Sequence, residues 1–269
     1  MGKRSLFIQT ESLNHQQITD LVTKAKNDPD VEAIILHTWD LVKAQLIKNI
    51  IPYSSDGKYK RLIVGLAKPS AQDYTAILSD EWRWASVTSA SAVALEAAPY
   101  ADGWYIPYET GMNVFESEEF RSRWEWYLGD LVRRLRAVRD IPIVWSPYLF
   151  GPLSAPAVQG WARTMKLLGS WYSPGVKFEC HVQDGVGAQF QTQASAIMWL
   201  KALKAADSGV TVKVNVEWFA LPGYTPVNAY AREAAYAAAG IAIGAAWEIR
   251  YWAAVEPNTG PGVDPTFNY

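Results

Sequence analysis

A single (β/α)8 barrel is the fold that this sequence predicts, on two observations. Eight short apolar or β-branched segments recur along the 269 residues, and segments with helical spacing lie between them. This alternation fits a closed parallel barrel of about 250 residues. A doubly wound open sheet is the main alternative. It normally carries a glycine-rich turn after its first strand, whereas the segment QTESLN that follows the first strand here has no glycine.

The expected strands share a simple pattern: each is short and apolar, and each ends in polar or aromatic residues. In chain order they are 5–10, 31–39, 61–67, 103–110, 141–150, 176–185, 210–220 and 243–252.

Helical spacing fills the intervals between these strands. The helix expected over 117–138 has the clearest start, because Ser117 is a favourable N-cap and acidic residues fill the first turn. The others are expected at 14–27, 40–53, 153–169, 187–206 and 226–240, with a loop and then a helix within 71–100. No linker or internal repeat divides the chain. We therefore expect one domain over 1–269, with an irregular tail over about 256–269.

The composition narrows the classes of function. With 25 Lys and Arg against 27 Asp and Glu, no basic excess points to nucleic acid or to an anionic membrane surface. No apolar run is long enough to span a membrane, and the first residues are too polar for a signal-peptide core. The single cysteine excludes an internal disulfide, and the three histidines show no metal-ligand spacing. We expect no metal and no cofactor.

Aromatic residues are abundant, with 13 Trp and 14 Tyr. At that density they form either a heavy core or a surface on which flat ligands stack, and sugars are the commonest ligands of that kind. The sequence alone leaves both interpretations open.

The stretch VTVKVNVEWFA, residues 210–220, is the most informative strand. Its valines alternate with Lys213, Asn215 and Glu217, so the apolar and polar residues occupy opposite faces. In a (β/α)8 barrel the active site lies at the carboxyl ends of the strands. We therefore expect the polar face of this strand to line the barrel interior, with Glu217 at the mouth.

Two further carboxylates follow strand ends, Glu109 after the fourth strand and Asp184 after the sixth. Each of the three has a structural alternative. Glu217 could pair with a lysine or arginine, Glu109 could be a solvated loop acid, and Asp184 could serve the Asp-Gly turn in which it stands. Glu248 is interpreted as half of a structural ion pair, and His37 as a core or rim histidine.

Two carboxyl groups across a cleft are the arrangement that glycoside hydrolysis requires. We expect Glu109 to act as the general acid and base and Glu217 as the nucleophile of a retaining enzyme, on an oligosaccharide or polysaccharide. Glu217 would be the base if the enzyme inverts. The residues expected to bind the sugar are Asp184, Gln183, Tyr108, Trp145, Tyr148, Asn215, Trp218 and Trp252.

The two glutamates resemble the acid/base and nucleophile positions of the large clan of retaining (β/α)8 glycosidases. Tyr108 stands where that clan usually has an asparagine before the strand-4 glutamate. A family of glycosidase-like barrels, still called a domain of unknown function, is more similar. The motifs that carry this resemblance, in order, are GWYIPYE (103–109), SPYLF (146–150), QDGVG (183–187) and NVEWF (215–219). The resemblance implies a barrel fold and a carbohydrate-active enzyme.

Two other functions remain open. A glycan-binding barrel without catalysis would use the same aromatic residues. A barrel enzyme for a phosphorylated metabolite would need phosphate-binding loops after the last two strands. The segments LPGYTP and AAVEPNTGPG found there do not form an obvious backbone cradle, which counts against the second alternative.

Overall fold

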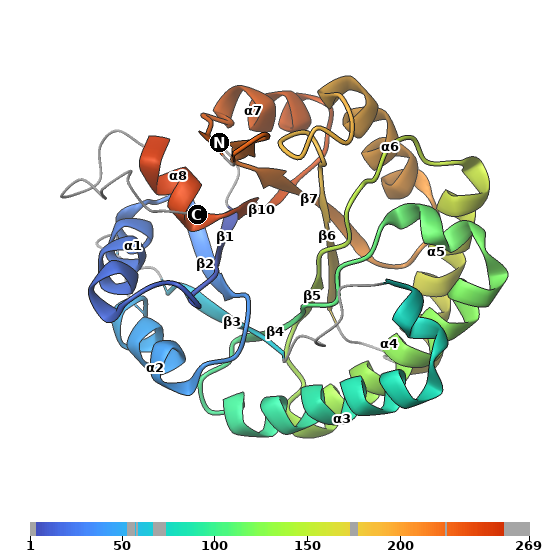
Figure 1. Cartoon of the computed structure of the whole chain (residues 1–269), viewed down its shortest axis with the longest axis horizontal. Helices are drawn as coiled ribbons and strands as arrows, with labels where there is room; N and C mark the ends of the chain where they lie inside the picture. The colour runs from blue at the N-terminus through green and yellow to red at the C-terminus, as the bar shows by residue number, and fades with distance from the viewer. Residues whose placement is uncertain are drawn as a thin grey trace.

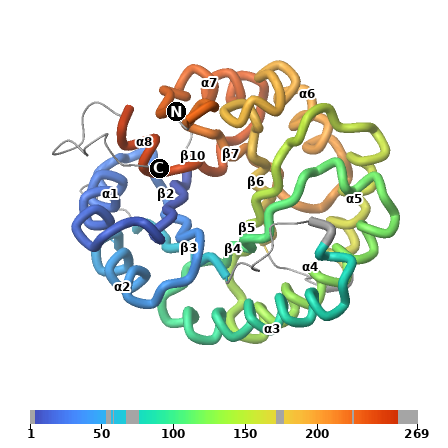
Figure 2. The backbone as a smooth tube through the Cα atoms, in the orientation of Figure 1, coloured from blue at the N-terminus to red at the C-terminus, as the bar shows by residue number. Residues whose placement is uncertain are grey.

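The computed structural model describes residues 4–52, 57, 59–66, 74–172, 177–223 and 225–255. Within these residues, parallel strands close into a barrel in the order β1-β10-β7-β6-β5-β4-β3-β2. The helices lie around the outside of the strands (Figure 1), and Figure 2 traces the chain round this ring from the first strand to the last helix. The predicted (β/α)8 barrel is confirmed.

Each barrel strand overlaps the segment predicted for it. All eight end earlier than predicted, and after most of them the polar and aromatic residues that follow belong to loops. The barrel strands are β1 (Arg4–Ile8), β2 (Val31–Leu36), β3 (Arg61–Gly65), β4 (Gly103–Ile106), β5 (Ile143–Trp145), β6 (Phe178–Gln183), β7 (Thr211–Glu217) and β10 (Ile243–Trp247). A short antiparallel pair follows β7, formed by β8 (Phe219–Ala220) and β9 (Thr225–Pro226).

The helices also follow the predicted alternation. Ser117 caps α4 as expected, since its hydroxyl accepts a hydrogen bond from the Phe120 N–H at 3.5 Å. The α-helices are α1 (His15–Asn27), α2 (Leu41–Ile50), α3 (Asp80–Ala97), α4 (Glu118–Val138), α5 (Ala155–Leu167), α6 (Gln193–Ala205), α7 (Tyr230–Ala238) and α8 (Ile249–Val255). Shorter turns are η1 (Tyr74–Leu78), η2 (Met112–Glu116) and the π-turn η3 (Leu168–Tyr172).

Helices α3 and α6 begin furthest from their predicted positions. Helix α3 was expected from the stretch SAVALEAA (91–98), but it occupies 18 residues, because Ser79 caps it and two acids fill its first turn. Helix α6 starts at Gln193 rather than near 187, since Thr192 is its N-cap and the preceding residues form a loop. The expected irregular tail, 256–269, lies outside the described residues.

The last strand is the clearest error. We expected it over 243–252, but β10 ends at Trp247 and the chain turns into α8, where Arg250 and Trp252 are buried. An apolar and aromatic run of this length has no periodicity that separates a buried strand from a buried helix.

The barrel interior has an apolar part and a polar part. Inward side chains of six strands pack into one cluster, formed by Phe7, Ala33, Ile35, Ile63, Tyr105, Val144 and Ala245. On β6 and β7 the inward side chains are polar. Glu179 Oε2 lies 2.8 Å from both Lys213 Nζ and His181 Nε2. These hydrogen bonds, the one with His181 foremost, lower the pKa of Glu179 to about 2.

Aromatic side chains fill the space between the barrel and its outer helices. The rings of Tyr108 and Trp145 lie 5.1 and 5.4 Å from the ring of Trp124, measured between centroids. The indole N–H of Trp145 donates to the Tyr108 carbonyl at 2.9 Å. All three side chains are buried. The abundant tryptophans of this region therefore serve the core.

We predict that Trp145→Ala lowers the free energy of unfolding by roughly 3–5 kcal/mol, because it removes a fully buried ring. Trp84→Ala is the matched control. Trp84 is 52% exposed on α3, and we expect its loss to cost less than about 1 kcal/mol. Urea denaturation followed by far-ultraviolet circular dichroism measures both values. Equal stability of the two variants would contradict a core role for Trp145.

Candidate active site

The carboxyl ends of the barrel strands bring the predicted acids to one end of the barrel. Glu217 is the last residue of β7, Asp184 directly follows β6, and Glu109 lies three residues beyond β4. Parallel strands all end at the same face of a closed barrel, so this placement follows from the topology. The hydrogen bonds divide the three acids into two groups.

The first group surrounds Glu109. The Tyr105 hydroxyl donates to Glu109 Oε1 at 3.0 Å, and His37 Nε2 lies 3.7 Å from the same oxygen. The Glu109 side chain is 20% exposed, so a ligand in the mouth can reach it. Tyr105 has its pKa raised well above the ordinary value by burial first and then by Glu109, which keeps the hydroxyl a donor.

Trp247 completes this side of the mouth. It is the last residue of β10, and its ring lies 4.8 Å from Phe7 and 5.2 Å from His37, measured between centroids. It is partly buried, whereas Trp252, which we had expected to line the cleft, lies buried in α8. The misplaced end of the last strand explains why the sequence analysis missed Trp247. His37, interpreted from sequence as a core or rim residue, belongs to this group.

The second group joins Glu217 to Asp184, and both side chains are almost wholly buried. Asp184 Oδ2 accepts the Tyr236 hydroxyl at 2.9 Å and lies 3.6 Å from Arg232 Nε. Asp184 Oδ1 accepts the backbone N–H groups of Val186 and Glu217, each at 3.3 Å. Asp184 therefore does more than serve its Asp-Gly turn: it ties the β6 loop, the end of β7 and α7 together.

Glu217 has fewer donors than Asp184. Its Oε2 accepts the Ala188 N–H at 2.8 Å, while its carboxyl group lies close to the Asp184 charge. Burial first, and then Asp184, raise the pKa of Glu217 to about 8. Burial also raises the pKa of Asp184, but its hydrogen bonds and Arg232 favour the charged form. Glu217 has fewer compensating donors than Asp184, so we expect it to be the member of the pair that keeps a proton near neutral pH.

Gly187 allows the loop after β6 to close over Glu217. A Cβ atom at this position would lie 2.3 Å from the Phe219 carbonyl oxygen and 2.9 Å from Glu217 Cβ. Only glycine fits such a close approach of two backbone segments. The second glycine of the QDGVG motif thus has a direct role in placing the Ala188 N–H on the carboxyl group of Glu217.

The remaining predicted residues other than Tyr148 are buried. Trp218 is buried outside the barrel, where its indole N–H donates to Glu233 Oε1 at 3.2 Å. Asn215 and Gln183 are buried and donate to the Ser146 hydroxyl and carbonyl at 3.0 and 3.1 Å. Four rings expected to bind the sugar are fully buried and cannot contact a ligand in the mouth: Tyr108, Trp145, Trp218 and Trp252.

Glu248 forms the structural ion pair expected from the sequence. Its Oε2 accepts from Arg250 Nε at 2.7 Å, and its Oε1 accepts the Gln9 N–H at 3.1 Å. The residue follows β10 rather than lying within it, and the Trp247–Glu248 peptide bond is cis. This buried pair joins the end of β10 to the end of β1.

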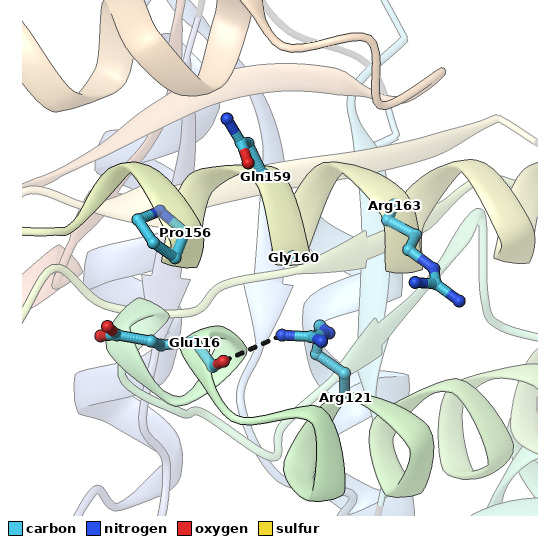
Figure 3. A pocket seen from close by; sticks show the side chains of 6 residues that line it. All are labelled: Glu116, Arg121, Pro156, Gln159, Gly160 and Arg163. Atoms are coloured by element: carbon cyan, nitrogen blue, oxygen red, sulfur yellow. Dashed lines mark hydrogen bonds between the residues drawn. The ribbon is translucent and has the colours of Figure 1, made fainter.

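A separate hollow of about 380 Å³ lies in the outer layer, between η2, α4 and α5 (Figure 3). Arg121 Nη1 donates to the carbonyl oxygens of Phe115 and Glu116, both at 2.9 Å, and so fastens α4 to η2. The Glu116 carboxylate points away from Arg121 in Figure 3. This hollow lacks the paired carboxyl groups of the mouth and is not our candidate site.

Two further properties concern only the described part of the chain. No three histidine, cysteine, aspartate or glutamate side chains there come together in a way that could hold a metal ion. None of its helices combines the length and apolar character that crossing a membrane requires.

Comparison with known proteins defines the family and the fold. The sequence model of DUF4434, a domain of unknown function, matches residues 70–240. No curated protein sequence matches the chain.

Several solved structures are similar in fold. A family 18 chitinase from Crocus vernus has 15% identity and a TM-score of 0.55, covering 91% of this chain and 92% of that one. A GH18 chitinase from Pseudoalteromonas aurantia has 11% identity and a TM-score of 0.60, with 91% and 93% covered. An old yellow enzyme homologue from Zymomonas mobilis has 9% identity and a TM-score of 0.56, with 92% and 84% covered. At these identities the likeness shows the barrel fold alone.

The raised pKa of Glu217 predicts a dependence of stability on pH. The folded chain holds a proton on this carboxyl group up to about pH 8, whereas the unfolded chain releases it near the ordinary value of 4.5. Stability must therefore fall as pH rises through this window. Glu217→Gln removes the titration. Between about pH 5 and about pH 9, we expect the free energy of unfolding of wild type to fall by roughly 2–4 kcal/mol relative to that of this variant.

Urea denaturation at a series of pH values measures this difference. Glu119→Gln, an exposed change on α4, is the matched control and should follow wild type. Parallel curves for wild type and Glu217→Gln would show that Glu217 is ionised in the folded chain at neutral pH.

Proposed function

We propose that this chain, which belongs to the DUF4434 family, is a glycoside hydrolase whose two catalytic carboxyl groups are those of Glu109 and Glu217. The observation that carries the proposal is the contrast between these groups at one barrel mouth. Glu217 is buried and keeps its proton near neutral pH, while Glu109 is partly exposed and accepts a hydrogen bond. Two carboxyl groups in different surroundings, one suited to donate a proton and one open to the ligand, are what this chemistry needs.

Their environments support a different role for each glutamate. Glu217 donates its proton to the glycosidic oxygen as the bond to the anomeric carbon breaks. Glu109 either attacks that carbon or takes a proton from the water that does, according to the separation of the two carboxyl groups. This assignment reverses the one expected from the sequence, because the raised pKa of Glu217 suits a proton donor better than a nucleophile.

Neighbouring side chains support these roles. The Tyr105 hydroxyl holds the Glu109 carboxylate in one orientation through its 3.0 Å hydrogen bond. Trp247, at the end of β10, offers an aromatic surface beside His37, the neighbour of Glu109, on which the apolar face of a sugar ring can stack. The Ala188 N–H fixes one oxygen of Glu217.

A glycan-binding barrel without catalysis is the second candidate, and one observation favours it. The Glu217 residue is only 3% exposed beneath the loop after β6, which limits direct contact with a glycosidic oxygen. In that case the Asp184–Glu217 pair would serve only to hold β6, β7 and α7 together, and the aromatic residues of the mouth would bind the sugar.

Activity of two isosteric variants separates the candidates. We predict that Glu109→Gln and Glu217→Gln each lower hydrolysis by roughly 10²–10⁴-fold, because each removes a proton-transfer or nucleophilic group. Release of reducing ends from a panel of soluble polysaccharides measures the rate. Glu119→Gln, with an exposed carboxylate on α4, should retain wild-type activity.

Two results would contradict the proposal. Undiminished hydrolysis in both variants would remove these glutamates from the chemistry. Wild type that binds glycans from the panel but releases no reducing ends would instead support the non-catalytic barrel.

A further inference from the structure

Three aromatic side chains lie together at the carboxyl end of the barrel, and two of them were not expected from the sequence. Tyr148 and Phe150 belong to the loop after β5, and Phe190 to the loop after β6. We call these three residues the rim aromatic cluster. The Phe150 and Phe190 rings are 4.7 Å apart between centroids, and each lies 6.3 Å from the Tyr148 ring.

The cluster is open to solvent, unlike the aromatic residues of the core. Phe150 is 51% exposed and Phe190 is 42% exposed. The two rings meet at 61°, edge against face, so neither covers the other as a stacked pair would. Exposed apolar rings grouped at the functional end of a barrel mark a binding surface.

The backbone beneath the cluster is well ordered by hydrogen bonds. The Tyr148 N–H donates to Thr110 O, and Tyr148 O accepts from the Met112 N–H, both at 3.0 Å. The Leu149 N–H donates to Gln183 O at 3.1 Å. The loops after β4, β5 and β6 are thereby joined into one continuous surface. A ligand that meets rings on a rigid support loses little free energy to ordering them.

The same loop connects the cluster to the proposed catalytic carboxyl group. Phe190 closes the loop through its N–H, which donates to Gly185 O at 2.9 Å. Two residues earlier, the Ala188 N–H donates to Glu217 Oε2 at 2.8 Å. Gly185 has a φ of +65°, a conformation that favours glycine. One short loop thus has an exposed ring at its outer end and a contact with Glu217 at its inner end.

A polar side chain borders the rings. A Cβ atom built on Gly111 would lie 2.6 Å from Asn113 Oδ1, 3.4 Å from the Tyr148 ring and 3.6 Å from Phe150 Cβ. The exposed Asn113 amide is therefore near the cluster and can hydrogen-bond hydroxyl groups. Aromatic rings beside an amide match the surface of a pyranose, which has apolar C–H faces and a rim of hydroxyls.

We propose that the rim aromatic cluster is a subsite for a pyranose unit of a glycan chain whose neighbouring units enter the barrel mouth. The inference rests on the proposed action on glycans and adds that the substrate is a chain rather than a single sugar with a small leaving group. Tyr148, expected from the sequence to bind sugar, belongs to this subsite together with Phe150 and Phe190.

The test compares wild type with the double variant Phe150→Ala/Phe190→Ala and with the control Trp84→Ala. Trp84 is equally exposed, at 52%, but lies on α3. Native gels containing hydroxyethyl cellulose, xylan, glycol chitin or pectin measure binding without any need for catalysis. We expect wild type and Trp84→Ala to be retarded by at least one polymer. The double variant should bind that polymer roughly 10- to 100-fold more weakly, at about 3- to 10-fold per ring.

Chain-length dependence gives the second readout. For a polysaccharide that wild type hydrolyses, the double variant should lose kcat/KM on long oligosaccharides yet keep the wild-type rate on an aryl glycoside of the same sugar. Circular dichroism establishes that both variants are folded. The proposed subsite is overturned if wild type and the double variant are retarded equally in every gel. It is also overturned if wild type is retarded in none of them. If wild type binds a polymer through these rings but hydrolyses none, the result contradicts only the proposed hydrolase.

Discussion

The buried carboxylate of Asp184 is the constraint on which the mouth of this barrel depends. A charge removed from water is tolerated only when hydrogen bonds and an opposite charge replace the lost solvation. Here two backbone N–H groups, the Tyr236 hydroxyl and the Arg232 guanidinium provide that replacement. Because these donors come from the β6 loop, from β7 and from α7, satisfying one carboxylate fixes the relative positions of three elements.

The state of Glu217 follows from that arrangement. Its carboxyl group is buried next to Asp184, and the backbone N–H groups of Ala188 and Gly187 are the donors that face it. Keeping a proton is then less costly than holding a second negative charge. Glu109 stands on the other side of β5 and β6, partly exposed and supported by Tyr105. One barrel thus presents two carboxyl groups whose different surroundings suit different roles.

Much of the fold and part of the candidate site could be predicted from the sequence, because the alternation of apolar and polar residues along a strand is a local property. The pattern of residues 210–217 predicts Glu217 on the inward face, and the same alternation turns Trp218 towards the helices, where it is buried. The last strand ends at Trp247 rather than at Trp252, because the backbone turns into α8 between them. The local sequence pattern does not specify where this turn occurs. Phe150 and Phe190 come together only through contacts between loops, so their shared exposure had no signal in the sequence. The protonation of Glu217 likewise depends on burial created by Gly187 and α7.

The measurement that tests the central claim most directly is the ionisation of Glu217 itself. Protein labelled with ¹³C at the glutamate side-chain carboxyl carbon can be titrated by NMR, with Glu217 assigned as the resonance missing from the Glu217→Gln variant. A midpoint at about 8 would establish a carboxyl group that holds a transferable proton at neutral pH. A midpoint near the ordinary value of 4.5 would mean that the Asp184–Glu217 pair does not store that proton, and the role proposed for Glu217 would be wrong.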